Sequence, residues 1–282
     1  MSLVAHDCAS ILTQRQAVDG DEVAALLALL TEVPLAGRTI SMDAGLLSGA
    51  ATQTITQQQG EYIGMVKGNN PEVLAVLDEW VAAEVLSPSA ETAAPLPVPE
   101  AQIAPPRRKR SVSGPRPELR PRRAPDAQTV EKSRGRLEIR ELWVVAADDP
   151  GPYLAAEWGW QAVEQIAWVR RWRRRRPSEL WTVEQVTMVT SRTAARSDPA
   201  DLLALLRGHW TIENRVHWVR DMSFHEDRLH GRAIGGMLSW LRNMAINLIR
   251  RVWPASLIPD AWSRLSLDPR IALRWLHIPL MN

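Results

Sequence analysis

One stretch of the chain concentrates residue types that can do chemistry on phosphates. Between positions 207 and 227 a carboxylate, Glu213, lies among histidines, arginines and tryptophans. Residues three, four and seven apart share one face of a helix, so a single side is predicted to carry His209, Glu213, His217 and Arg220. A carboxylate flanked by cations suits a site that holds a divalent metal ion beside phosphate oxygens. The spacing is equally compatible with an amphipathic helix whose charges are only solvated.

A second acidic candidate, Asp43, follows a short β-type run at 39–42. The carboxyl ends of strands are where α/β sheets collect ligand-binding groups. An Asp in this position also often starts a turn or caps the next helix. At the end of the next predicted strand, Lys67 is placed to reach a phosphate and Asn69 to order the loop. An ordinary strand end with a Gly-Asn turn explains these two residues equally well.

Arginine clusters form candidate DNA-binding surfaces. One cluster lies at 107–110 and 120–123, and a second, with interleaved tryptophans, lies at 168–176. Such clusters neutralise phosphates with salt-dependent, sequence-independent affinity, and the tryptophans could stack on unpaired bases. We expect DNA contacts from Arg136, Arg170, Arg171, Arg173 and Arg174. The alternatives are a solvated linker, a strand held by salt bridges, and tryptophans that belong to the core.

The elements that must position these residues follow from sequence patterns. We expect a hairpin at 3–5 and 10–17, helices at 22–31, 50–59 and 71–85, and strands at 38–42 and 61–67. Such alternation favours an α/β sheet with parallel strands. Further on, residues 136–146 and 181–191 are predicted strands and 161–167 a weaker helix or strand. Residues 199–228 and 233–252 are predicted to be helices.

Composition bounds the class of protein. The chain has 282 residues, 45% of them hydrophobic, and a net charge of +2, which allows a buried core. The single cysteine excludes an intrachain disulfide and fits a reducing interior. With no long apolar run and no signal-peptide pattern, we expect a soluble cytoplasmic protein. Residues 87–132 are Pro-rich and then Arg-rich without any helical or strand period, which predicts a flexible insert.

The signature segment resembles a known family. His209-Trp210-x-Ile212-Glu213-Asn214, with His217-Trp218-x-x-Asp221-x-x-Phe224-x-Glu226-Asp227, is similar to the C-terminal signature of H-repeat-associated insertion-sequence transposases. These belong to the DDE superfamily, whose Glu-bearing helix carries a Tyr-x2-Arg-x3-Glu-x6-Lys pattern. The four places fall here on Leu206, His209, Glu213 and Arg220. Asp43-Ala44 resembles the family's second catalytic Asp, although Gly45-Leu-Leu-Ser48 stands where a His-Thr-Gln cluster is usual.

This resemblance implies a ribonuclease-H-like α/β core, a mixed sheet with flanking helices. It also implies metal-dependent phosphoryl transfer on DNA with Mg²⁺ or Mn²⁺. Asp43 and Glu213 would be metal ligands. His209 and Arg220 would lie beside the phosphate or hold Glu213 in place. The residues expected to support this site from behind are Asn214, His217, Asp221, Glu226 and Asp227.

The implied partners are the element's terminal repeats and target DNA, with a homodimer in the transposition complex. A zinc site built on His217, His225 and His230 is a weaker alternative, because no cysteine lies nearby and the zinc-type paired spacing is absent.

One part of the family pattern has no counterpart. The family's first Asp lies in an Asp-Gly-Lys-like motif on a central strand upstream of the hairpin, and no such segment occurs here. We therefore expect the first catalytic Asp to be absent and the neighbouring strands to expose an open sheet edge. The expected division is a first core part at 1–86, an insert at 87–132, a second core part at 133–252 and a Trp-containing tail at 253–282. The leading hypothesis is an incomplete DDE transposase. A catalytically dead DNA-binding remnant and an unrelated basic scaffold are the competing hypotheses.

Overall fold

A computed structural model of the chain describes residues 2–6, 9–15, 17–87, 120–121, 123–133, 135–176, 178–212, 215–216, 218–224, 235–254 and 257–275. The chain forms two compact units. Unit 1 comprises Met1–Ala25 with Arg207–Asn282, and unit 2 comprises Leu26–Leu206. None of the helices in these described ranges is both long and apolar enough to cross a membrane.

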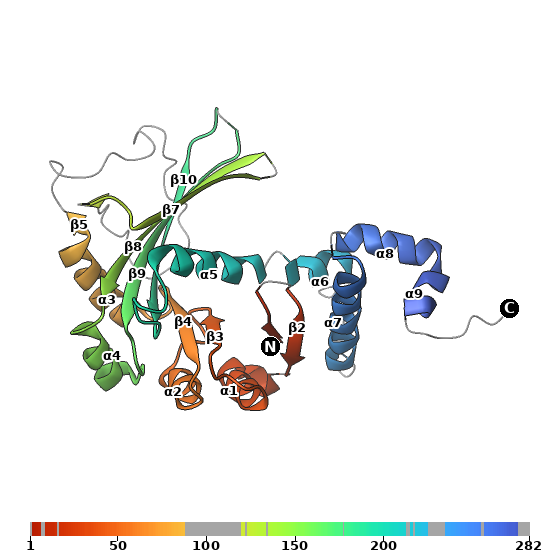
Figure 1. The fold of residues 1–282 in the computed structure, drawn as a ribbon, viewed down its shortest axis with the longest axis horizontal. Coiled ribbons are helices and arrows are strands. Elements are labelled where there is room, and N and C mark those ends of the chain that lie inside the picture. Colours follow the sequence, from red (N-terminus) through yellow and green to blue (C-terminus); the bar gives the residue numbers. More distant parts are fainter. Residues whose placement is uncertain are drawn as a thin grey trace. The chain divides into compact units, whose positions relative to one another are not determined.

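Unit 2 is built on a mixed sheet with the strand order β3-β4-β10-β9-β8-β7. The strands are β3 (Thr39–Met42), β4 (Glu61–Val66), β7 (Ala127–Ser133), β8 (Arg136–Ala146), β9 (Gln165–Arg174) and β10 (Thr182–Thr190). Only β3 and β4 pair in parallel within the described sheet, and all the other neighbours are antiparallel. The predicted mixed sheet is therefore confirmed, and the parallel strands expected from the strand–helix alternation of the first region are β3 and β4. Among the described strands, β3 forms one edge and β7 the other, with the long β8–β10 meander between (Figure 1).

The helices of this part are α1 (Glu22–Glu32), α2 (Gly49–Gln57), α3 (Pro71–Glu84), α4 (Pro150–Trp158) and α5 (Pro199–Ile212). Helix α2 begins at Ser48, whose Oγ accepts a hydrogen bond from the backbone N–H of Ala51 at 3.3 Å, as in an N-cap. Helix α3 has the predicted proline in its first turn. Helix α4 was not predicted, because its prolines and glycine resemble a turn in the sequence, yet a proline in the first turn of a helix is tolerated.

The segment 87–132 contains more structure than its composition predicts. Residues 88–119 and 122 lie outside the described residues. The short strands β5 (Leu86–Ser87) and β6 (Arg120–Pro121) pair with each other, and β7 continues the main sheet. The prediction of an insert without elements is therefore wrong for 127–132. Strand β7 owes its place to pairing with β8 rather than to apolar residues, since its Val130 is 60% exposed.

Unit 1 joins the two ends of the chain. The predicted hairpin is confirmed as β1 (Ser2–Val4) and β2 (Ile11–Gln14), followed by a short 3-10 turn, η1 (Val18–Gly20). The C-terminal helices are α6 (Trp218–Ser223), α7 (Gly235–Val252), α8 (Ile258–Leu267) and α9 (Pro269–Trp275). The side-chain amide of Asn247 forms two hydrogen bonds with the backbone of Ile11: its Oδ1 accepts from the N–H at 2.8 Å, and its Nδ2 donates to the carbonyl at 2.7 Å. These bonds hold α7 against β2.

The predicted helix over 199–228 is described as two α-helical segments, with residues 215–216 between them in π-helical conformation. Helix α5 ends at Ile212 and α6 begins at Trp218, with Glu213, Asn214 and His217 outside the described residues. Helix α5 and the segment from Val216 into α6 contribute apolar side chains to different cores. Leu202, Leu203 and Leu206 of α5 are buried and lie in unit 2. By contrast, Val216 and Val219 belong to the apolar cluster of unit 1. Whether one helical face carries residues 209–220 stays a prediction, because Glu213, Asn214 and His217 lie outside the described residues.

Candidate functional site

Asp43 and Lys67 meet where the two parallel strands end. Strand β3 ends at Met42 and β4 at Val66, and their parallel register places both carboxyl ends at the same edge. Lys67 Nζ lies 2.6 Å from Asp43 Oδ1. Both side chains are about half exposed, at 47% and 53%. The sequence predicted each residue separately as a site candidate, and the structure brings the two together.

Side-chain alternation directs Asp43 outward. Its neighbours Met42 and Ala44 are buried, at 1% and 5% exposure, and so fix the strand end in the core. The following turn is closed by the Leu46 N–H, which donates to the Asp43 carbonyl at 2.9 Å. Asn69 Nδ2 donates to the Ala44 carbonyl at 3.0 Å, so Asn69 orders this turn as predicted.

A glycine lets this turn pack onto the sheet. A Cβ added to Gly64 of β4 would lie 2.5 Å from Leu47 Cδ1, a distance that real Cβ atoms do not show. Leu47 is itself 5% exposed, so it occupies the space that the missing side chain leaves. The turn that carries Asp43 is therefore held against β4 by close packing as well as by the Asn69 hydrogen bond.

The predicted partners of Asp43 on the signature segment are only partly described. Glu213, Asn214, His217, Glu226 and Asp227 lie outside the described residues, as do His225 and His230. His209 is in the last turn of α5, within the range of unit 1, whereas Asp43 belongs to unit 2. Arg220 of α6 donates from its Nη2 to Ser239 Oγ of α7 at 2.7 Å. Asp221 follows it in the same helix. The joint site of Asp43 and Glu213 stays a prediction.

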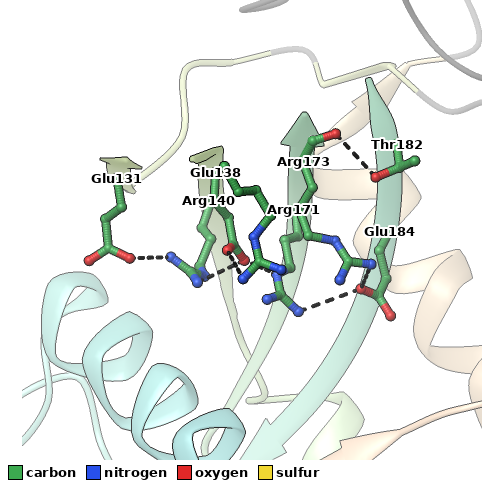
Figure 2. Close-up of polar contacts among 8 residues, drawn as sticks. Glu131, Glu138, Arg140, Arg171, Arg173, Thr182 and Glu184 are labelled. Atoms are coloured by element: carbon green, nitrogen blue, oxygen red, sulfur yellow. Dashed lines mark hydrogen bonds and ion pairs between the residues drawn. The ribbon is translucent and has the colours of Figure 1, made fainter. Parts of the chain in front are cut away.

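Two of the five arginines predicted to bind DNA, Arg171 and Arg173, lie in an ion-pair ladder across one face of the sheet. The contacts run from Glu131 through Arg140 and Glu138 to Arg171, and from there through Glu184 to Arg173 (Figure 2). Four adjacent strands, β7 to β10, contribute to it. We call this set the arginine ladder. Its partners face one another because Arg140 is registered with Arg171, and Glu138 with Arg173.

The centre of the arginine ladder is shielded from water. Glu138 is 7% exposed at its side chain and contacts Arg140 at 2.8 Å, Arg136 at 3.3 Å, and Arg171. Burial alone would raise the pKa of Glu138, but these three guanidinium groups lower it below its ordinary value. Arg171 and Arg140 are therefore held by a shared carboxylate inside the sheet. Arg136 is less buried, at 41% exposure.

Arg170 lies on the opposite face and is part of the core. It is 5% exposed, and its Nε donates to Glu141 Oε2 at 2.8 Å. The same oxygen accepts from Trp172 Nε1 at 2.8 Å. The guanidinium carbon lies 5.1, 5.8 and 5.0 Å from the ring centroids of Trp143, Trp168 and Trp172. Burial lowers the pKa of Arg170, while Glu141 acts in the opposite direction. In this position Arg170 cannot reach a DNA phosphate, and the alternative of core tryptophans holds for this part of β9.

The glutamates of this region were missed as partners. Glu138, Glu141 and Glu184 each pair with arginines of the predicted DNA-binding cluster. The alternating Arg-Glu-Arg pattern of β8 was the available signal, and it suggested salt bridges without naming their partners. Only the strand register assigns them.

A divalent metal site is not complete within the described residues. No group of three or more His, Cys, Asp or Glu residues comes together among them. Asp43 alone fits as an oxygen ligand for a hard cation, since its carboxylate is accessible and stands at a strand end.

Fold and site together define a mixed α/β protein with an acidic residue at the carboxyl edge of a parallel strand pair. A family model for the "Transposase DDE domain" matches residues 10–248. The chain therefore belongs to the DDE transposase family.

Named relatives agree with this membership. "Putative transposase YncI" of Escherichia coli O157:H7 is 27% identical over 124 residues, which are 43% of this chain and 31% of the relative. "Putative protein YbfL" and "H repeat-associated putative transposase YhhI" of Escherichia coli K12 are each 23% identical over 237 residues, 81% of this chain. The chain spans about half the length of these two, 52%. No solved structure matches it.

Proposed function

We propose that the chain belongs to the H-repeat-associated group of insertion-sequence transposases and acts on DNA by metal-dependent phosphoryl transfer at the ends of a mobile element. Family membership supports the reaction class. The single observation that carries the site is the Asp43–Lys67 pair at the shared end of β3 and β4, because it joins a metal-binding oxygen to a phosphate-binding cation. The order of β3, α2 and β4 is compatible with a ribonuclease-H-like core.

The proposed roles follow from side-chain chemistry. Asp43 and Glu213 would hold Mg²⁺ or Mn²⁺, which when bound supplies Lewis-acid stabilisation of charge on the phosphate. Lys67 would contact a phosphate oxygen, and Asn69 keeps the Asp43 turn in place through Ala44. His209 and Arg220 would lie beside the phosphate or orient Glu213. The supporting set stays as predicted: Asn214, His217, Asp221, Glu226 and Asp227.

The test is strand cleavage of DNA that carries the element's ends, with Mg²⁺ or Mn²⁺ present. We expect nicking by the chain to be lost in Asp43→Asn and in Glu213→Gln. The matched control is Glu157→Gln, which removes an exposed carboxylate of α4. Nicking that persists in both site variants would contradict the proposal.

A second candidate function is DNA binding without catalysis. It is favoured by the arrangement at Asp43, where the described residues bring one carboxylate and a lysine but no cluster of metal ligands. In that case the chain would bind DNA with an affinity that falls steeply with added salt, and no variant or metal ion would produce or abolish cleavage. DNA binding that does not respond to salt would count against both functions.

A further inference from the structure

We propose that Arg175 and Arg176, at the end of the β9–β10 hairpin, bind backbone phosphates of duplex DNA independently of sequence. This inference rests on the proposed function and identifies the protein surface that meets its substrate. It selects two residues from the basic cluster at 168–176 that were not among the individual arginines expected to contact DNA. The ligand class is the phosphodiester backbone of a double helix.

Strand alternation divides the arginines of β9 between the two faces of the sheet. Within β9, Arg171 and Arg173 point to the ladder face and pair with Glu138 and Glu184. Arg170 points to the other face and pairs with Glu141. Next along that face, the Arg174 guanidinium lies 4.6 Å from the ring centroid of Trp181. The run thus places four of its arginines on internal partners.

The two arginines beyond the strand are different. Arg175 and Arg176 follow the last residue of β9 and are exposed. The Arg176 side chain is 81% exposed, and its Nε lies 4.0 Å from Glu179, the outer limit of an ion pair. An exposed pair at that distance contributes little, so phosphate oxygens can replace the carboxylate at small cost.

The support beneath these arginines is fixed. Trp181, at the far side of the hairpin end, is 3% exposed and packs with Trp172 and Ile139 in a small apolar cluster. The Thr182 hydroxyl donates to the Arg173 carbonyl at 3.1 Å, so the pairing persists to the end of β9. Figure 2 shows Arg173 and Thr182 at this end of the strands. Less conformational freedom is lost on binding when the backbone that carries a guanidinium is already ordered.

Charge balance favours an anion as the partner. The hairpin end and the arginine ladder together contain more arginines than glutamates: Arg136, Arg140, Arg171, Arg173, Arg174, Arg175 and Arg176 against Glu131, Glu138, Glu179 and Glu184. Glu131, Glu138 and Glu184 pair with the inner arginines, and Glu179 lies 4.0 Å from Arg176, so the exposed end with Arg175 and Arg176 keeps a net positive charge. A guanidinium binds phosphate through two parallel hydrogen bonds, and consecutive arginines can follow adjacent phosphates along one strand.

The experiment measures the affinity of the whole chain for a 30-base-pair duplex at several KCl concentrations, in EDTA so that no cleavage occurs. Each phosphate contact contributes about 0.9 to the slope of log K against log salt. The double variant Arg175→Ala/Arg176→Ala is expected to lose about 1.8 from that slope, and Arg175→Lys/Arg176→Lys to keep it. The matched control is Arg270→Ala/Arg274→Ala, which removes two exposed arginines of α9.

The outcomes separate this inference from the proposed function. A slope unchanged in Arg175→Ala/Arg176→Ala, an equal loss in the α9 control, or no duplex binding by the wild type would each overturn the hairpin assignment. If the chain does not nick DNA but the slope of log K against log salt changes as expected, the hairpin assignment still holds. Thermal unfolding of each variant monitors the fold, and the lysine variant keeps the test valid if the alanine variant is unstable.

Discussion

Charged side chains are arranged differently at the carboxyl end of β3 and β4 and across strands β7 to β10. At β3 and β4, one carboxylate and one lysine meet at a half-exposed strand end. Across β7 to β10, arginines and glutamates form ion pairs on the sheet, and several of these side chains are almost fully buried. In the charge-rich region of β7 to β10 the arginines and glutamates pair with one another, whereas the Asp43 carboxylate at the end of β3 is accessible. A dense basic run is therefore weak evidence by itself for a binding site, because strand pairing can match its arginines with internal glutamates.

The two regions are also expected to differ in how much each ion pair contributes to the stability of the fold. An exposed ion pair such as Asp43–Lys67 contributes roughly 0–1 kcal/mol to folding. Removal of one partner from a buried pair costs about 3–5 kcal/mol, because the remaining charge is left without compensation. Substitutions should therefore affect stability strongly on the β7–β10 side and weakly at the Asp43 site. Metal and DNA binding should respond in the reverse order.

The largest effect is expected at Arg170. Arg170→Met leaves the Glu141 carboxylate buried with the Trp172 indole N–H as a donor but without its cation, and should lower the free energy of unfolding by about 3–5 kcal/mol. Arg170→Met/Glu141→Leu removes both charges and should regain most of that loss. Urea unfolding of both variants gives the comparison. A double variant as unstable as the single one would show that the pair is not the cause.

A smaller loss is expected at the centre of the ladder. Glu138→Gln keeps the shape but removes the charge shared by Arg136, Arg140 and Arg171, so it should cost about 2–3 kcal/mol. Glu179→Gln is the matched control, since its 4.0 Å contact involves an arginine that is 81% exposed. Equal unfolding midpoints for the two variants would remove the distinction between buried and exposed pairs.

The ladder also predicts an acid dependence. The folded-state pKa of Glu138 lies below its ordinary value of 4.5, so its contribution is fully present above that pH and is lost as pH falls through the folded pKa. The stability difference between wild type and Glu138→Gln should therefore shrink below about pH 4.5. Urea titrations at pH 7, 5, 4 and 3 measure it. A difference that stays constant over this range would argue against a lowered pKa.

The smallest effect on stability is expected at Lys67. Lys67→Met removes the partner of Asp43 from an exposed pair and should change the unfolding free energy by less than about 1 kcal/mol. The same variant should weaken DNA binding, if the amine contacts a phosphate. Thermal unfolding and duplex affinity are measured on one sample. A large drop in stability would place Lys67 among the structural charges.

The sequence predicts the elements well where apolar period and turn residues coincide. The bounds of β8 agree with the prediction, and those of β3, β4, α2 and α3 differ by only a few residues. The Asp43 and Lys67 candidates depend on two strand ends, which local patterns locate. The α/β prediction favoured parallel strands, but only the structure shows that β3 and β4 are neighbours and bring the two residues together.

Pairing across the sheet could not be predicted in the same way. Whether Arg171 faces Glu138 or solvent depends on the register of β8 against β9, which no local pattern specifies. The period of two in the arginine run was present in the sequence, with Trp168, Arg170 and Trp172 alternating with Val169 and Arg171. That pattern indicated a strand with two different faces, but the basic composition suggested a DNA surface instead.

The most direct test of the account is Mn²⁺ binding to the full chain, measured by the loss of the free-ion signal in electron paramagnetic resonance. If Asp43 is a metal ligand, Asp43→Asn should weaken the affinity by about tenfold or more, while Glu157→Gln and Arg171→Lys should leave it unchanged. Asp43→Asn that binds Mn²⁺ as tightly as the wild type would contradict the assignment of the site to the end of β3.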